Sequence, residues 1–259
     1  MPADHPYGFL DKIDKPSYVW FEDHWTHDDD DEHIHLQAQF IYVSKGFQYL
    51  HVGGRVHLLP QNHAAWIPAN VAHRTASNAP DVRLMTIFYQ MDGVPSFYDD
   101  VRVFALPPVL MAMITYAEKW NKLQEYSMQE DTFLKAILFE LPNFWEQSLS
   151  LVLPAVTDAR LSRICAYILE HYRQDLNFQE LAQKHFLTLR TLQRLFKKET
   201  DLTAVKYLQL VRIIKSMELL GSGLYTVSQV AAKVGYGSVQ SFSASFYAIM
   251  KERPHLFLS

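Results

Sequence analysis

The sequence predicts an α+β chain of two domains: a β-barrel or sandwich with accessory helices, followed by an all-α domain. Three observations support this prediction. Short segments rich in Val, Ile, Tyr and Phe, separated by turn residues, occupy residues 33–91. Apolar residues at helical spacing follow from about residue 109. One helix-turn-helix pattern then occurs twice between residues 179 and 247. With 259 residues, the chain is long enough for two cores.

The β-rich part is expected to contain short, closely spaced strands. Turn residues such as Gly46, Gly53-Gly54 and Pro68-Ala69-Asn70 separate them, a pattern typical of a barrel or sandwich. Residues 1–32 are polar and irregular, and their acidic end at 28–32 is expected to form an exposed turn. The predicted strands are 36–43, 47–52, 55–59, 64–67, 71–75 and 82–90.

Two accessory helices are expected at 109–127 and 129–149, and Pro142 should end or kink the second. They should lie against the barrel, and they could also form the seam of a homodimer. The linker is expected within 151–158, with Asp158 capping the next helix. The predicted domains are therefore 1–153, for effector binding and dimerisation, and 154–259, for DNA binding.

Composition and charge limit the possible functions. No apolar run approaches the roughly 20 residues of a membrane span, and the N-terminus lacks a secretory signal, so a cytoplasmic protein is expected. A single cysteine, Cys165, excludes an intrachain disulfide. Residues 156–259 carry 14 Lys and Arg against 8 Asp and Glu, whereas residues 1–155 carry 10 against 20. Only the C-terminal part is therefore suited to approach phosphate.

The first helix-turn-helix copy has an amphipathic second helix, residues 188–198. Its apolar stripe is Leu192, Leu195 and Phe196, and Thr188 can cap its N-terminus. Arginine can read guanine and glutamine can read adenine in the major groove. Lys197, near the helix end, is better placed for phosphate. The residues expected to contact DNA are Thr188, Arg190, Thr191, Gln193, Arg194 and Lys197.

The second copy has a different outer face. Thr188 and Ser238 are 50 residues apart, as are Phe196 and Phe246. The outer residues Gln240, Ser243, Ala244 and Tyr247 carry no charge, so attraction to phosphate would have to come from elsewhere, such as Lys233, Lys251 or Arg253. A long helix at about 203–220, ending at Gly221, should hold the two copies at a fixed spacing. The residues expected to contact DNA here are Ser238, Gln240, Ser241 and Ser243.

Residues 178–220 and 226–258 resemble the DNA-binding domain of the AraC/XylS family of bacterial transcription regulators. The resemblance implies two recognition helices in adjacent major grooves and contact with RNA polymerase. The chain departs from the family where Ala244 replaces the usual Arg, Tyr247 the usual Lys, and Asp201 and Lys251 usual glycines. The matching residues are Leu181-Ala182, Thr188, Arg190, Leu192, Arg194, Phe196 to Glu199, Tyr207-Leu208, Arg212, Leu219-Leu220, Val230-Ala231, Gly235-Tyr236, Phe242-Ser243 and Pro254.

Eight of the twelve histidines fall between residues 24 and 73. His33 and His35 should share one strand face with Gln39, and His73 follows the turn after Pro68. This pattern resembles the two sequence segments of the cupin fold, so the first domain is identified as a cupin-like barrel. Cupin enzymes hold a divalent metal with three His and one Glu. The corresponding metal ligands here would be His33, His35, Gln39 and His73, with Gln39 in the usual place of Glu.

Two interpretations of this cluster remain open. Imidazole nitrogens suit a divalent transition metal such as Zn, Fe or Ni. Alternatively, the same side chains line a barrel pocket and hydrogen-bond a small, partly apolar effector. The predicted ligand-binding residues are His33, His35, Gln39, Tyr49, Trp66 and His73.

The predicted function is a transcription regulator that binds double-stranded DNA and responds to a small effector or a metal. RNA polymerase is the expected protein partner, and neither a membrane association nor an enzymatic activity is expected. Two alternatives remain: a cupin-type metalloenzyme with a helical appendage, and a metal-ion sensor.

Overall fold

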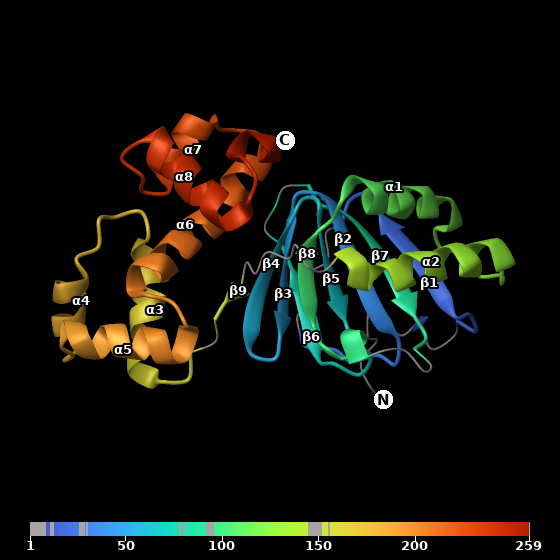
Figure 1. The fold of residues 1–259 in the computed structure, drawn as a ribbon, viewed down its shortest axis with the longest axis horizontal. Coiled ribbons are helices and arrows are strands. Elements are labelled where there is room, and N and C mark those ends of the chain that lie inside the picture. Colours follow the sequence, from blue (N-terminus) through green and yellow to red (C-terminus); the bar gives the residue numbers. More distant parts are fainter. Residues whose placement is uncertain are drawn as a thin grey trace. The chain divides into compact units, whose positions relative to one another are not determined.

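The computed structural model describes residues 9–10, 13–25, 29, 31–77, 79, 81–91, 96–144, 152–154 and 156–258. The chain divides into two compact units, one formed by residues 1–53 and 57–150 and the other by residues 54–56 and 151–259. Strands dominate the first unit and helices the second (Figure 1). The prediction of an α+β chain, with a sheet-rich part before an all-helical part, is confirmed. No helix among the described residues is long and apolar enough to cross a membrane.

The first unit is built on two antiparallel sheets. The larger has the strand order β1-β7-β2-β5-β8, and the other contains β6, β3 and β4 in that order. The register places Gln39 of β2 opposite Ile67 of β5 and Phe88 of β7. The strands are β1 Ser17–Glu22, β2 Ala38–Lys45, β3 Phe47–Val52, β4 Arg55–Pro60, β5 His63–Ile67, β6 His73–Ala76, β7 Arg83–Tyr89 and β8 Arg102–Ala105.

Strand alternation separates two apolar layers in this unit. Ile41, Ala65 and Ile67 of the larger sheet pack with Leu50 and Leu59 of the other sheet, which forms the barrel interior. The opposite face of the larger sheet packs against α1 (Pro108–Ala117), a 3₁₀ turn (Glu118–Trp120) and α2 (Met128–Phe144). Figure 1 shows these helices running along that sheet. The accessory helices therefore pack against the barrel, as predicted.

Three local expectations were wrong. Strands β1 and β8 were missed, because residues 1–32 were interpreted as polar throughout although β1 is rich in aromatic residues, and because β8 is only four residues long. Asp29 is buried rather than part of an exposed turn, because it hydrogen-bonds Thr75. The first accessory helix ends before the predicted residue 127, since α1 ends at Ala117 and the 3₁₀ turn at Trp120. Helix α2 contains Pro142 and is described as far as Phe144. The predicted helical residues 145–149 lie outside the described part of the chain.

One buried ion pair explains why a polar N-terminal segment joins the core. The Lys15 ammonium donates to the Glu130 carboxylate of α2 at 2.6 Å and to the Leu123 carbonyl at 2.8 Å. Both charged side chains are at most 3% exposed. Because each buried charge has an oppositely charged partner, residues just before β1 can lie against α2.

From residue 152 on, the described residues are helical or irregular apart from the two-residue strand β9 (Val152–Leu153). Each helix from α3 to α8 begins after a Ser, Thr, Asn or Asp whose side chain accepts a backbone hydrogen bond, which satisfies donors that a helix start leaves open. The predicted caps Asp158 and Thr188 are among them. The helices are α3 Ala159–His171, α4 Phe178–Lys184, α5 Leu189–Thr200, α6 Ala204–Gly221, α7 Val227–Lys233, α8 Val239–Met250 and the 3₁₀ helix η5 Pro254–Phe257.

Helix α6 is the centre of this unit. Its buried residues lie on more than one face, for example Val211, Ile213 and Met217, because α5, α7, α8 and η5 all pack around the helix. Gly221 is the last residue of α6, and Ser222 takes the cap position predicted for the glycine.

Arg212 of α6 ties the two helix-turn-helix halves together. Its guanidinium donates to the carbonyl oxygens of Tyr172 and Gln174, both at 2.8 Å, at the end of α3. It also lies 5.4 Å from the centre of the Tyr236 ring, in the turn between α7 and α8. Gly235, in the same turn, has a φ of +90°, and an added Cβ would meet the Arg173 carbonyl oxygen at 2.6 Å.

We therefore predict that Gly235→Ala destabilises the helical unit by more than about 1 kcal/mol, since it adds both strain and a backbone clash. Gly237→Ala is the matched control, because an added Cβ at Gly237 meets nothing within 4 Å. Urea unfolding followed by far-ultraviolet circular dichroism measures both. Equal unfolding midpoints for the two variants would contradict the assigned role of Gly235.

Candidate nucleic-acid interface and histidine cluster

Helix α5 presents the predicted basic face. Leu192, Leu195 and Phe196 are buried, whereas Arg190, Gln193, Arg194 and Lys197 are exposed. At the helix start, the Thr188 hydroxyl accepts from the Thr191 backbone NH at 3.1 Å. The two threonine hydroxyls also lie 2.9 Å apart. The face therefore offers three cations, an amide and hydroxyl groups to one ligand.

The four long side chains of this face are not equally available. Lys197 forms an ion pair with Asp201 and donates to the Asp201 carbonyl oxygen at 3.1 Å. The hydrogen bond from Lys197 to the Asp201 carboxylate lowers the pKa of that carboxyl. Among the described residues, no ion pair engages Arg190 or Arg194. The two arginines are therefore free to hydrogen-bond base edges, whereas Lys197 would have to leave Asp201 to contact phosphate.

Helix α8 repeats the start of α5. The Ser238 hydroxyl accepts from the Ser241 backbone NH at 3.2 Å, and the two serine hydroxyls lie 2.9 Å apart. Gln240 and Ser241 are exposed and Ser243 is half-buried, while Phe242, Phe246 and Met250 form the buried stripe. The structure thus gives both predicted DNA-contacting sets the same local geometry, on faces of different charge.

The two turns differ by one residue. Four residues separate α4 from α5, and five separate α7 from α8. Both turns close through the same kind of bond, from Leu187 NH to the Ala182 carbonyl and from Tyr236 NH to the Ala231 carbonyl, each 2.9 Å. The additional residue of the second turn thus falls after this bond.

The structure brings His33, His35, Gln39 and His73 together in the first unit. All four are buried, and ligand nitrogens of the three histidines lie within 4.8 Å of one another. His33 and His73 form a β-bridge through two backbone hydrogen bonds of 2.8 and 3.0 Å. The Gln39 Oε1 atom lies 3.1 Å from His35 Nε2 and 2.8 Å from His73 Nε2.

Each of the three imidazole rings has an oxygen atom near its Nδ1 atom. His35 Nδ1 donates to the Gln37 carbonyl at 2.7 Å, and His73 Nδ1 donates to the Val71 carbonyl at 2.8 Å. His33 Nδ1 lies 3.7 Å from the Asp29 carboxylate. Because a carbonyl only accepts, the neutral rings of His35 and His73 carry their proton on Nδ1 and direct a bare Nε2 towards Gln39.

Two of the predicted ligand-binding residues lie elsewhere. Trp66 packs in the layer between the larger sheet and the accessory helices, and its indole NH donates to the Tyr98 carbonyl at 3.0 Å. Tyr49 contacts Phe47, on the face of β3 opposite to Leu50. Strand alternation thus places both side chains on faces that do not carry the histidine cluster. Their positions therefore do not support the predicted role in binding a ligand there.

Two contacts were not predicted from the sequence. The first is Asp29, whose spacing of four residues from His33 was hidden by the acidic run around it. The second is Glu199, at the end of α5. Its carboxylate accepts from the Thr157 backbone NH at 3.0 Å and the Thr157 hydroxyl at 2.6 Å, and these bonds lower the pKa of Glu199. Glu199 therefore anchors α5 to the start of α3.

Comparison with known protein families gives two matches. The family model described as an AraC-like ligand binding domain matches residues 16–139. A second, described as a helix-turn-helix domain, matches residues 181–259.

Individual proteins are similar over parts or most of the chain. The HTH-type transcriptional activator RhaS of Klebsiella pneumoniae (strain 342) is 37% identical over 89 residues, which are 34% of this chain and 32% of RhaS. The match thus spans about a third of that relative. Among solved structures, the C-terminal domain of the response regulator AraT from Geobacillus stearothermophilus is 28% identical over 39% of this chain and 84% of its own, with a TM-score of 0.37. ToxT from Vibrio cholerae is 13% identical over 94% of this chain and 98% of its own, with a TM-score of 0.39.

The two family matches occur in the order in which the sequence predicted an effector domain and a DNA-binding domain. The chain therefore belongs to the AraC/XylS family of transcription regulators, with an N-terminal ligand-binding domain.

Proposed function

We propose that this protein is a transcription activator that binds specific double-stranded DNA sequences under the control of a small effector. The exposed face of α5 carries the proposal, because Arg190, Gln193 and Arg194 project from a capped recognition helix. Helix α8 provides the second contact. The matched RhaS segments belong to proteins named as transcriptional activators, which supports activation and RNA polymerase as the partner. Such a regulator acts where the chromosome is, in the cytoplasm.

The effector is proposed to bind at the histidine cluster of the first unit. Gln39, His35 and His73 place hydrogen-bonding groups beside the Phe88 ring, whose centre is 5.5 Å from that of His35. A small molecule with polar and apolar parts would satisfy both surfaces. If its binding changes DNA affinity, DNA must change effector affinity by the same factor.

Arg194→Ala tests the DNA-contacting role of α5. A duplex selected from random sequences by the purified full chain provides the probe, and mobility shifts at several salt concentrations give the affinity. We expect a loss of about 1–3 kcal/mol and relaxed preference at one base position, since a bidentate contact is removed.

Arg55→Ala, which removes an exposed arginine from β4, is the control and should bind as wild type does. Unchanged affinity and preference in Arg194→Ala would remove the role of this residue. Failure to select any sequence at any salt concentration would contradict the proposed function itself.

A second candidate function, metal sensing, is supported by the atoms facing Gln39. In the neutral histidines, two bare Nε2 atoms and the Gln39 carbonyl oxygen are all acceptors, and a cation between them would satisfy all three. Adjacent ligands of an octahedral metal lie about 3 Å apart when metal–ligand bonds are about 2.1 Å. Oxygen atoms behind Nδ1 orient metal-binding histidines in the same way. His33, His35, His73 and Gln39 would hold a divalent transition metal.

Metal content tests this candidate directly. Wild-type protein equilibrated with Zn²⁺, Ni²⁺ or anaerobic Fe²⁺ and then desalted should retain about one ion per chain by mass spectrometry. His73→Ala should lose it, and His24→Ala should not, because the His24 side chain is 71% exposed. Equal metal content in wild type and His73→Ala would contradict a metal site and leave the Gln39 amide as the partner of both rings.

We also propose a homodimer that forms through the accessory helices. Tyr116, Met128 and Phe139 are 55%, 73% and 60% exposed, and a pocket of about 560 Å³ lies between the first two and Trp120. Sedimentation velocity should show a dimer for wild type and a monomer for Met128→Glu. Leu36→Glu, at a similarly exposed apolar residue outside these helices, should stay dimeric. A monomeric wild type at micromolar concentration would contradict the dimer.

A further inference from the structure

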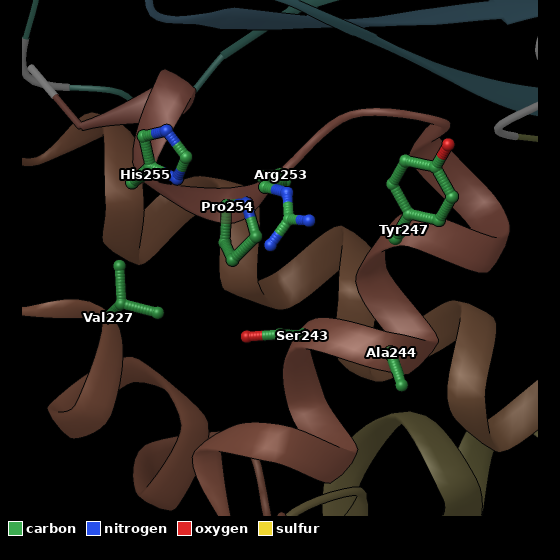
Figure 2. A pocket seen from close by; sticks show the side chains of 7 residues that line it. All are labelled: Val227, Ser243, Ala244, Tyr247, Arg253, Pro254 and His255. Atoms are coloured by element: carbon green, nitrogen blue, oxygen red, sulfur yellow. The ribbon is translucent and has the colours of Figure 1, made fainter.

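A pocket of about 320 Å³ lies beside the outer face of the second recognition helix. Ser243, Ala244 and Tyr247 of α8 line one side of it, and Arg253 and His255 line the other (Figure 2). In Figure 2 the Arg253 guanidinium and the Ser243 hydroxyl both project into the space between η5 and α8. The pocket thus joins a cationic group from the C-terminal segment to the face that is expected to meet DNA.

Helix α8 lacks the cations that α5 carries on its outer face. The outer face formed by Gln240, Ser243, Ala244 and Tyr247 has no charge, whereas the matching face of α5 has three cations. Without a cation, α8 could make hydrogen bonds to bases but would gain little from the phosphate backbone, which dominates DNA affinity. Ala244, at the position where the family usually has Arg, also lines the pocket.

Arg253 is held in place but not neutralised. The next residue, Pro254, is buried, and the Phe257 ring lies 5.4 Å from the Phe246 ring of α8, so η5 is packed firmly onto the recognition helix. Arg253 itself is exposed, and within residues 156–258 no carboxylate forms an ion pair with it. Lys197, by contrast, is paired with Asp201. The backbone at Arg253 is therefore held beside α8, and its guanidinium has no carboxylate partner within residues 156–258.

We infer that this pocket receives a phosphate group of the DNA backbone, with Arg253 as its cationic ligand. The inference rests on the proposed DNA-binding function. A guanidinium matches two phosphate oxygens, and the hydroxyls of Ser243 and Tyr247 can donate to the same group. His255 adds a further nitrogen on the Arg253 side. The cation that α8 lacks is thus supplied by the turn after it.

Arg253→Ala tests the inference by its salt dependence. Loss of one phosphate contact should weaken binding to the selected duplex and to an unrelated duplex by the same factor. It should also reduce the slope of log affinity against log salt by about 1. Arg253→Lys, which keeps the charge, should retain the wild-type slope, and Arg55→Ala is the control for removing any exposed arginine.

A compensating variant makes the test specific to the pocket. Ala244→Arg in the Arg253→Ala background returns a cation to the opposite wall and should restore the slope. An unchanged slope in Arg253→Ala, with Arg194→Ala still impaired, overturns the inference and leaves DNA binding intact. A loss confined to one base position would show base reading and also overturn it. If the wild-type protein selects no sequence, the proposed DNA-binding function, on which this inference rests, is contradicted.

Discussion

The contacts of Arg212 hold the two halves of the DNA-binding unit together. One side chain from the central helix α6 binds two carbonyl oxygens at the end of α3 and lies against Tyr236 in the second turn. Gly235 allows this turn to approach Arg173 so closely that no other residue fits. Because α6 also packs against α5, α7 and α8, the two recognition helices belong to one compact unit. A rigid spacing near 34 Å is what two successive major grooves on one DNA face require.

Within this body the two halves have taken different chemical roles. Both recognition helices start with the same pair of hydroxyl groups, and both turns close with the same backbone bond. The first half carries its cations on the helix itself. In the second half, the helix face is neutral and Arg253 lies in the segment that follows. In our proposal, hydrogen bonds from Gln240 set sequence preference, while Arg253 and the pocket beside α8 supply affinity for phosphate.

Periodicity and spacing predicted most of the helical unit, because capping, amphipathic faces and the doubled pattern are local properties. The histidine cluster was predicted from strand spacing together with the resemblance to the cupin segments, and the structure brings His33, His35, Gln39 and His73 together. Tertiary contacts account for what was missed. The Lys15–Glu130 pair buries a segment that reads as polar, and Asp29 is buried by Thr75 and His33. Trp66 could not be placed from sequence, because alternation alone does not say which face of β5 meets the helices.

The central claim is that the two halves bind DNA together but unequally. Hydroxyl-radical footprinting of the full chain on its selected duplex, at rising salt concentration, tests this claim most directly. The account predicts two protected patches on one face of the DNA, about 10 base pairs apart. The patch assigned to α8 should disappear at lower salt than the patch assigned to α5. A single patch at all salt concentrations, or two patches that disappear together, would contradict it.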